Sequence, residues 1–301
     1  MTAAGQAPAS PAAARAPAGR VADGREACSR LSTGSSGTGG RRELRAWATR
    51  ELAAAGCVSA AAEAAWLLEE APDDDTLRRL VARRAAGEPL QYVIGWAPFG
   101  GLRLAVGPGV FVPRPETEGL ADRAARHLRA AGPRPVAVDL CTGSGAIACF
   151  LAAEVPGARV LATELDPGAL AWARVNAERH GVEVLTGDLD APLPAELAGR
   201  VGVLCANVPY VPSAAIATLP TDVRDHEPRL SLDGGPDGLD VFRRLAGRAG
   251  HWLAPGGRLF AEIGEDQAEA AATLLTAAGL AGVAVHQDLV GRDRIVEGSR
   301  P

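Results

Sequence analysis

Short apolar runs alternate with stretches of helical periodicity from Val136 to the end of the chain, and this alternation limits the fold more than any other feature. The runs that predict strands are 136–140, 159–163, 182–185, 201–206, 257–263, 283–287 and 294–296. The segments that predict helices are 146–154, 167–180, 238–253 and 267–278. Strands that alternate with helices are typical of a parallel, doubly wound α/β sheet. The last two strands are joined by a short loop around Gly291, so this pair is predicted to be antiparallel.

The chain before this region divides into parts of different character. Residues 1–40 consist mainly of Ala, Pro, Gly, Ser and Arg, and they cannot bury enough apolar surface to offset the entropy of ordering them. We expect a disordered tail there. Residues 41–90 carry apolar residues at helical spacing and are predicted to form a small helical domain for packing or for docking a partner. Residues 91–301 are predicted to form the main domain.

A connector opens the main domain. The extended runs that predict a hairpin-like connector are 91–94, 98–104 and 110–112. The connector leads into Pro113-Arg-Pro-Glu-Thr-Glu118, where two prolines favour an extended backbone. A helix is predicted next, at 118–130, with Glu116 or Thr117 as its cap.

Composition excludes several classes of protein. The formal net charge is -5, which disfavours a protein whose affinity comes from nucleic-acid phosphates. The five cysteines are scattered without a CxxC pair, as expected of reduced thiols in the cytoplasm. The histidines and cysteines lack metal-ligand spacing, so no metal site is predicted. No uninterrupted apolar stretch reaches the roughly 18 residues of a membrane span.

Acidic side chains and glycines at the strand ends predict a cofactor site. Asp139 lies at the end of the first strand of the alternating region, and Gly143 and Gly145 let the following backbone turn tightly and approach a ligand. Glu164 follows the second strand, where it can accept hydrogen bonds from ribose hydroxyls. Asp188 follows the third strand at the same edge of the sheet, where it could meet an adenine amino group.

Two cofactors suit this arrangement, and one other interpretation of the loop is open. A NAD site would want a further glycine to pack the helix beneath a pyrophosphate, but Ala146 follows the turn. S-adenosylmethionine (SAM) carries a positive ammonium and sulfonium and no phosphate, so acids such as Asp139 suit it better. We therefore expect SAM. Cys141 could instead be a nucleophile, although the sequence near it offers no base partner.

The loop Asn207-Val-Pro-Tyr210 follows the fourth strand, at the edge where ligands bind in open α/β sheets. It suits a planar nitrogen substrate whose lone pair is delocalised. The Asn207 side-chain oxygen can accept one hydrogen bond from the substrate NH2, and the Val208 carbonyl can accept another. Pro209 favours an extended Val208, and Tyr210 can stack on the planar group. Catalysis would depend on positioning and polarisation rather than on a strong base.

Several segments, taken in order, resemble one enzyme family. They are Gly87–Gly95, Phe111–Glu118, Asp139–Ala148, Asn207–Tyr210, Glu227-Pro228 and Gly234–Leu239. From about residue 75 to its C-terminus the chain resembles the protein-(glutamine-N5) methyltransferases, whose best-known members methylate peptide chain release factors. The resemblance implies a class I SAM-dependent methyltransferase fold, Rossmann-like with seven strands, and a small N-terminal helical domain that helps dock the protein substrate.

The resemblance also implies roles for single residues. The expected SAM contacts, in addition to Asp139, are Cys141, Thr142, Gly143, Ser144, Gly145, Glu164, Asp188, Leu189 and Asn207. The expected contacts with the substrate glutamine are Asn207, Val208, Pro209 and Tyr210, with Arg114 and Pro115 beside them. Asn207, Pro209 and Tyr210 are the expected catalytic residues. The usual loop of the family is Asn-Pro-Pro-Tyr, and here Val208 replaces the first proline while still supplying a carbonyl.

Three other functions stay open. A methyltransferase for an exocyclic amine of DNA or RNA would use a related loop, but it would also want a basic channel and stacking aromatics, and the chain has only two Tyr and five Phe. A non-catalytic SAM-binding relative would bind SAM and transfer nothing, and a NAD-dependent oxidoreductase would bind NAD instead. The favoured prediction is a cytoplasmic enzyme that methylates a glutamine of a protein, expected to be a release factor, without stable binding to nucleic acid or membrane.

Overall fold

The computed structural model of the chain describes residues 38–301. The tail predicted at 1–40 therefore lies almost wholly outside the described residues, and so does Cys28. By its internal contacts the chain divides into residues 1–43 and residues 44–301. Of the first unit only residues 38–43 are described, and they form the start of a helix.

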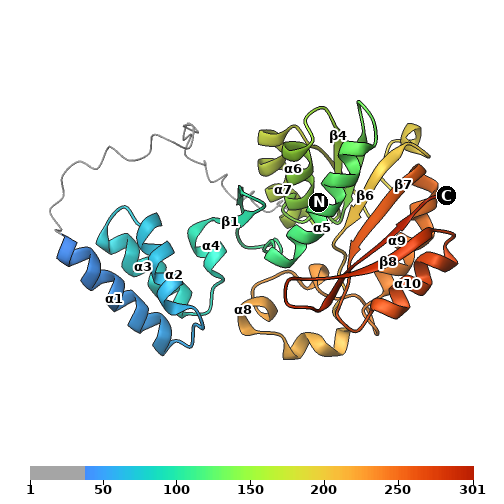
Figure 1. Ribbon diagram of the computed structural model, residues 1–301. Coiled ribbons are helices and arrows are strands. Elements are labelled where there is room, and N and C mark those ends of the chain that lie inside the picture. The colour runs from blue at the N-terminus through green and yellow to red at the C-terminus, as the bar shows by residue number, and fades with distance from the viewer. Residues whose placement is uncertain (1–37) are drawn as a thin grey trace, which may run out of the picture. The chain divides into compact units, whose positions relative to one another are not determined.

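Helices occupy the first part of the described chain (Figure 1). They are α1 (Thr38–Ala54), α2 (Ala60–Glu70), α3 (Asp74–Ala85) and α4 (Leu90–Ile94). Ala48, Leu52 and Leu67 are buried in one apolar cluster, to which α4 contributes Val93. The prediction of an extended run at 91–94 is therefore wrong. The segment is helical because its apolar residues pack into this cluster.

The connector is only partly as predicted. Strands β1 (Trp96–Phe99) and β2 (Leu102–Ala105) form an antiparallel hairpin, which confirms that part of the prediction. Residues 110–112 do not form a strand. The Tyr92 hydroxyl donates a hydrogen bond to the Val110 carbonyl, and Val112 is buried in the same small cluster, so side-chain contacts rather than strand pairing hold this segment.

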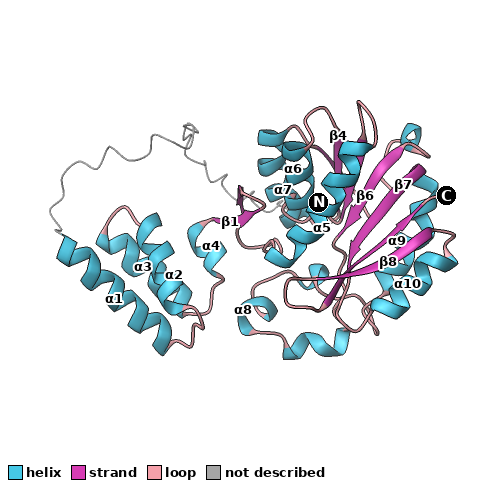
Figure 2. Ribbon diagram, viewed as in Figure 1, coloured by secondary structure: helices cyan, strands magenta, loops and turns pink. Residues whose placement is uncertain are grey.

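The main domain alternates helices and strands (Figure 2). Its helices are α5 (Pro115–Ala130), α6 (Ala146–Glu154), α7 (Pro167–His180), α8 (Thr221–Arg224), α9 (Asp240–Trp252) and α10 (Ala268–Ala277). Its strands are β3 (Val136–Leu140), β4 (Arg159–Glu164), β5 (Glu183–Thr186), β6 (Val201–Ala206), β7 (Leu253–Glu262), β8 (Ala281–Gln287) and β9 (Asp293–Ser299). Short 3-10 helices lie at Ala195–Leu197, Ser213–Thr218 and Arg229–Ser231.

These seven strands form one sheet in the order β5-β4-β3-β6-β7-β9-β8. The pairs from β5 to β7 are parallel, and β9 runs antiparallel to both β7 and β8. The predicted doubly wound sheet with an antiparallel last strand is therefore confirmed. The direction of winding reverses between β3 and β6, and ligands of open α/β sheets bind at such a reversal.

Helices cover both faces of the sheet, with α5, α6 and α7 on one face and α9 and α10 on the other (Figure 1). Alternate residues of a strand point to opposite faces. In β3, Ala137 belongs to the cluster beneath α5 and α6, whereas Val138 and Leu140 belong to the cluster beneath α9 and α10. The central strands are therefore apolar on both faces, which is why they read as continuous apolar runs in the sequence.

Asn176 of helix α7 is hydrogen-bonded to strand β2 and to the turn after β3. Its side chain is 1% exposed. The Nδ2 group donates to the carbonyls of Ala105 and Ser144 at 2.9 Å each, and Oδ1 accepts from the Ala105 N–H at 2.8 Å. One amide thus fixes strand β2 and the turn after β3 relative to α7 and satisfies three backbone groups.

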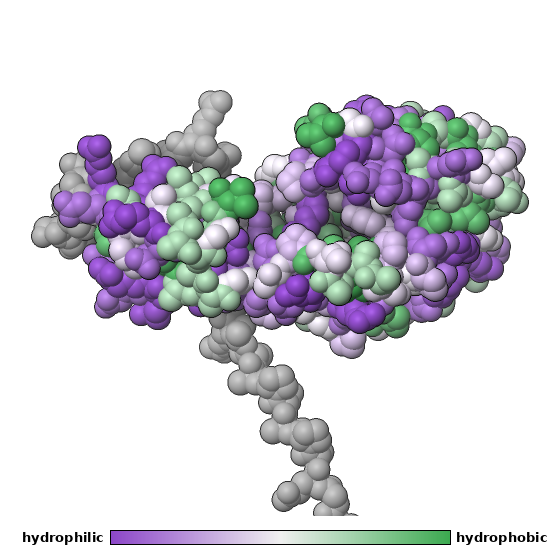
Figure 3. Space-filling model, turned by 90° about the horizontal axis from the view of Figure 1, so that it is seen from below, coloured by the Kyte–Doolittle hydropathy of each residue, from purple (hydrophilic) through white to green (hydrophobic). Residues whose placement is uncertain are grey.

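On the face that Figure 3 draws, hydrophilic side chains cover much of the surface, and apolar ones form patches between them. The large apolar residues that are exposed in the described chain are Val58, Leu165, Val175, Leu230, Leu289 and Val290. No helix within residues 38–301 is long and apolar enough to cross a membrane.

Replacing Asn176 with Ala should lower the free energy of unfolding by about 1–3 kcal/mol, because backbone groups of Ala105 and Ser144 would lose their partner. Denaturant unfolding measures this loss. The Val175→Ala variant, on an exposed position of the same helix, is the matched control. Equal stability of the two variants would contradict the role given to the Asn176 amide.

Candidate active site

A cavity opens where β3, β4, β5 and β6 end. The predicted site residues that line it are Arg114, Cys141, Thr142, Gly143, Ser144, Glu164, Asp188, Leu189, Asn207, Pro209 and Tyr210. The predicted residues that are absent from its lining are Pro115, Asp139, Gly145 and Val208. The cavity therefore joins the predicted cofactor edge to the Asn207–Tyr210 loop, as the order of the strands requires.

The N–H groups of Gly143 and Gly145, in the turn after β3, are hydrogen-bonded within the protein. The Gly143 N–H donates to Glu164 Oε2 at 2.8 Å, and the Gly145 N–H donates to the Thr142 carbonyl at 2.9 Å. Gly143 (φ 59°) and Gly145 (φ 86°) adopt left-handed torsions that favour glycine. A pyrophosphate would need free N–H groups and would face the Glu164 carboxylate, so this turn does not suit a dinucleotide. It suits a ligand that carries positive charge.

Glu164 holds the two sides of the cofactor edge together. Its Oε1 accepts from the N–H groups of Leu165 and Asp166 at 2.8 and 2.9 Å. Burial raises the pKa of Glu164, and the N–H groups of Asp166 and Gly143 oppose that rise. A carboxylate oxygen can accept two hydrogen bonds, and within residues 38–301 Oε2 accepts one, from the Gly143 N–H. Glu164 therefore retains acceptor capacity for a ribose hydroxyl.

Asp139 lies beneath the turn rather than in the cavity wall. It is 1% exposed, and its Oδ2 accepts from the Thr142 hydroxyl and from the Ala148 N–H, the latter at 3.2 Å. Its Oδ1 is buried and has no hydrogen-bond partner among the described residues. Burial raises the pKa of Asp139 to about 7. This carboxyl fixes the turn from beneath, and once it ionises, above about pH 7, it adds negative potential that fits the cationic end of SAM.

The structure argues against Cys141 as a nucleophile. Burial, with the nearby carboxylates of Glu164 and Asp139, raises the pKa of the Cys141 thiol far above its usual range. A thiol that stays protonated is a weak nucleophile.

Within residues 38–301 there is no group of three or more His, Cys, Asp or Glu side chains that could hold a metal ion.

The end of β5 adds two predicted residues and one that the sequence did not indicate. The Asp188 carboxylate accepts a hydrogen bond from Arg244 of α9 at 2.6 Å. Leu189 has φ 47°, a torsion that non-glycine residues rarely adopt. Arg244 also lines the cavity. Because it lies on a helix 56 residues away from Asp188 in sequence, no local pattern could reveal it.

The Asn207–Tyr210 loop is bound to two further side chains. Asn207 Nδ2 donates to Thr117 Oγ1 at 3.3 Å, and the Tyr210 hydroxyl donates to Glu262 Oε1 at 3.2 Å. Thr117 Oγ1 in turn donates to Glu262 Oε2 at 2.5 Å. Thr117 is buried and does not cap α5, so that prediction is wrong; the helix starts at Pro115 with Arg114 before it and no side-chain cap.

Val208 faces the core. Its side chain is 1% exposed and belongs to the same apolar cluster as Leu239 and Ile263. Replacement of the family's usual proline therefore adds apolar volume to the core and leaves the lining of the cavity to Asn207, Pro209 and Tyr210.

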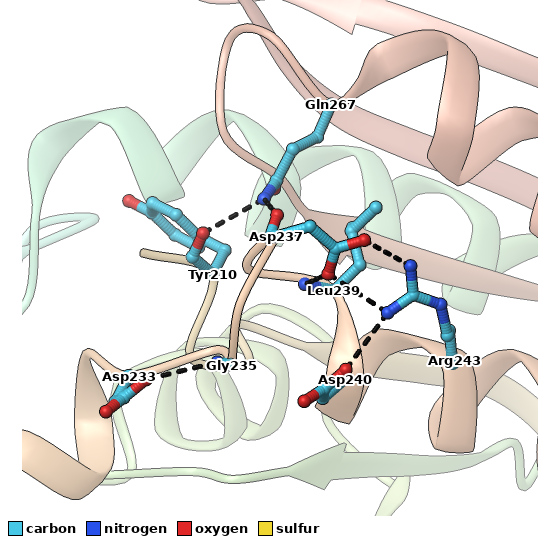
Figure 4. A network of polar contacts seen from close by, with 8 residues as sticks. All are labelled: Tyr210, Asp233, Gly235, Asp237, Leu239, Asp240, Arg243 and Gln267. Atoms are coloured by element: carbon cyan, nitrogen blue, oxygen red, sulfur yellow. Dashed lines mark hydrogen bonds and ion pairs between the residues drawn. The ribbon is translucent and has the colours of Figure 1, made fainter. Parts of the chain in front are cut away.

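The Gly234–Leu239 segment packs against the back of the loop (Figure 4). Gln267 Nε2 donates to the Tyr210 carbonyl at 3.0 Å and to the Asp237 carbonyl at 3.2 Å, and its Oε1 accepts from the Gly264 N–H at 2.8 Å. At Gly238, which has φ 77°, a Cβ atom would collide with the Tyr210 carbonyl. Glycine there lets the two backbones approach, and the Gln267 amide fixes their distance.

Arg114 and Glu227 connect two of the segments that carry the resemblance. Arg114 Nη2 contacts both carboxylate oxygens of Glu227, at 2.7 and 2.8 Å, and its guanidinium lies 4.6 Å from the centre of the Phe111 ring. Burial raises the pKa of Glu227 to about 7, and Arg114 opposes that rise. The pair holds Arg114 at the wall of the cavity. Pro115 is the first residue of α5 and sets the start of the helix.

The pH dependence of stability should reveal the burial of Asp139. Because its pKa is raised to about 7, the native state holds a proton that the unfolded chain releases above about pH 4. This group therefore makes the free energy of unfolding fall as the pH rises between these two values. The stability of the Asp139→Asn variant relative to the wild type should therefore increase between about pH 4 and about pH 7 and then stay level.

Denaturant unfolding across that range tests the prediction, with Asp122→Asn, at an exposed position of α5, as the control. A stability difference between the Asp139→Asn variant and the wild type that does not change with pH would contradict the assigned titration.

Comparison with known proteins identifies the family. Residues 137–225 match a family model described as a methyltransferase domain. A release factor glutamine methyltransferase of Geobacter sulfurreducens is 39% identical over 277 residues, which cover 85% of this chain and 95% of the relative. One of Mycolicibacterium smegmatis is 45% identical over 236 residues, which cover 76% and 82%.

Among solved structures, the T. thermophilus 16S rRNA N2 G1207 methyltransferase in complex with AdoMet and guanosine has a TM-score of 0.50 at 21% identity, with 68% of this chain and 50% of that chain covered. That similarity shows the fold alone. The relatives and the methyltransferase model together identify an enzyme that uses SAM as its methyl donor. The chain belongs to the release factor glutamine methyltransferase family.

Proposed function

We propose that this chain methylates the side-chain amide nitrogen of a glutamine in a peptide chain release factor, and that its Asn207–Tyr210 loop holds that amide. The observation that carries the proposal is a single cavity lined both by the acidic cofactor edge and by Asn207, Pro209 and Tyr210. SAM bound at the cofactor edge and a glutamine amide held by the loop would meet within this cavity.

The residues proposed to hold SAM are those after β3, β4 and β5. The turn 141–145 surrounds the methionine end, above the negative potential of Asp139. Glu164 accepts from the ribose, and Asp188 with Leu189 meets the adenine. SAM supplies an electrophilic methyl group on a sulfonium, and all other contributions come from the protein.

An amide nitrogen is a weak nucleophile because its lone pair is delocalised, and the loop is proposed to compensate for this. Asn207 Oδ1 accepts one hydrogen of the substrate NH2 and the Val208 carbonyl accepts the other, so the nitrogen becomes more electron-rich and is aimed at one point. Tyr210 packs on the planar amide and Pro209 keeps the preceding residue extended. Arg114, fixed by Glu227, lies where it can contact the substrate backbone.

The remaining parts of the proposal concern partner and place. Residues 41–90 are proposed to form the substrate-docking domain and residues 91–301 the catalytic domain; the separate apolar cluster of α1–α4 supports this division, although it includes Val93 of α4. A release factor acts in translation, so the proposed location is the cytoplasm. Stable binding to nucleic acid is not part of the proposal, and the net charge of -5 supports its absence.

Incubation with methyl-labelled SAM and purified release factors tests the function. We expect one methyl group on a single glutamine, located by tandem mass spectrometry. The Asn207→Ala variant should lose about 100-fold or more in turnover, since a preorganised contact to the reacting amide is removed, and should still bind SAM by calorimetry. Label in nucleic acid instead of protein, or wild-type turnover of the Asn207→Ala variant, would refute the proposal.

Position 208 offers an independent test. Val208→Pro should retain turnover within about threefold, because the carbonyl and the extended backbone are kept and the side chain remains apolar. Val208→Gly should reduce turnover by about tenfold or more, because the backbone gains freedom and the core loses volume. Similar turnover of both variants would show that the direction of the Val208 carbonyl is unimportant.

A further inference from the structure

Glu262 is a buried carboxylate at the end of β7 for which the proposed chemistry has no direct use. It is 2% exposed. The parallel pairing of β6 with β7 sets Ala206 opposite Ala261, so the next residues, Asn207 and Glu262, are neighbours at the edge of the sheet. Both oxygens of Glu262 are occupied: Oε2 accepts from Thr117 Oγ1 at 2.5 Å and Oε1 accepts from the Tyr210 hydroxyl at 3.2 Å.

A carboxylate can only accept hydrogen bonds, and this fixes the direction of the whole chain of contacts. The one hydrogen of the Thr117 hydroxyl goes to Glu262. Thr117 Oγ1 can then act only as an acceptor toward Asn207, which meets it with Nδ2 at 3.3 Å. The Asn207 side chain is a planar amide, so placing Nδ2 at Thr117 leaves Oδ1 as the group available to the cavity.

The opposite arrangement would present the wrong atom. Without an acceptor at position 262, the Thr117 hydroxyl is free to donate to Asn207 Oδ1. The Asn207 amide would then turn over and direct its NH2 at the NH2 of the substrate, where two donors meet and neither is satisfied. The proposed hold on the glutamine therefore needs an acceptor behind Thr117.

We propose that Glu262 is a positioning residue for methyl transfer: acting through Thr117, it sets the orientation of the Asn207 amide so that Oδ1 accepts from the substrate nitrogen. The inference rests on the proposed role of Asn207. The Tyr210 hydroxyl is fixed by the same carboxylate, so one buried charge aligns both functional side chains of the loop.

Three neighbours of Glu262 favour its charged form against the effect of burial. Burial raises the pKa of Glu262, and the Thr117 hydroxyl, the charge of Arg294 and the Tyr210 hydroxyl oppose that rise. The Arg294 guanidinium lies 6.0 Å from the centre of the Tyr210 ring, on the neighbouring strand β9. Glu116 is the one carboxylate among these neighbours that acts in the same direction as burial.

Variants at Thr117 and Glu262 test the proposal. Thr117→Val keeps the shape of the side chain and removes its hydroxyl, whereas Thr117→Ser keeps the hydroxyl and is the matched control. Glu262→Met keeps the length of the side chain and removes the acceptor. We expect Thr117→Val and Glu262→Met to lower kcat by about 10- to 100-fold with the Kd for SAM within about threefold of the wild type. Thr117→Ser should restore kcat to within about threefold.

The measurements are turnover of the release factor substrate, SAM affinity by calorimetry and the melting temperature of each variant. If the Thr117→Val variant does not fold, the kcat of the Glu262→Met variant tests the positioning role. Wild-type kcat in Thr117→Val or Glu262→Met, together with loss of turnover in Asn207→Ala, would overturn the positioning role and leave the proposed function intact. Equal losses in Thr117→Ser and Thr117→Val would also overturn it, because the hydroxyl would then be irrelevant. Retained turnover in Asn207→Ala would instead remove the proposed function itself.

Discussion

Parallel pairing of β3 with β4 and with β6 sets Leu140 level with both Thr163 and Ala206. The next residues, Cys141, Glu164 and Asn207, therefore lie together at one edge of the sheet, and the cavity forms there. Glu164 and Asn207 are far apart in sequence and become neighbours of one cavity through this alignment alone. Reversal of the winding between β3 and β6 keeps a covering helix from closing the edge.

Charge at this edge is buried, and each carboxylate is compensated in its own way. Glu164 is met by N–H groups, Glu227 by the Arg114 guanidinium, and Glu262 by two hydroxyls. Asp139 has one oxygen paired and the other not. A buried carboxylate without such partners would cost several kcal/mol, so the partners also lock the segments that carry them. The same buried carboxyl groups thus supply negative potential and hold the surrounding segments in place, and both effects suit a cationic cofactor.

The Asn207–Tyr210 loop is held in place for a related reason. Its Tyr210 carbonyl accepts a hydrogen bond from Gln267 (Figure 4) and lies against Gly238. The side chains of Asn207 and Tyr210 are hydrogen-bonded to Thr117 and Glu262. The Gly234–Leu239 segment therefore has a physical role: only glycine at 238 permits the contact with the Tyr210 carbonyl. An amide nitrogen is a poor nucleophile, so the proposed activation by position depends on a loop that is held in place in this way.

The sequence by itself determined the class of sheet, the antiparallel last strand and the residues after each strand end, because alternation, glycine and acid at those points are local properties. It also singled out the Asn207–Tyr210 loop, from which Asn207, Pro209 and Tyr210 line the cavity. It misjudged residues 91–94, whose helix depends on burial of Val93 in a distant cluster, and Thr117, whose hydroxyl serves Glu262 rather than a helix end. Arg244, Gln267 and Glu262 were decided only by tertiary structure, since their partners lie tens of residues away and burial and direction of hydrogen bonding, not local pattern, give them their roles.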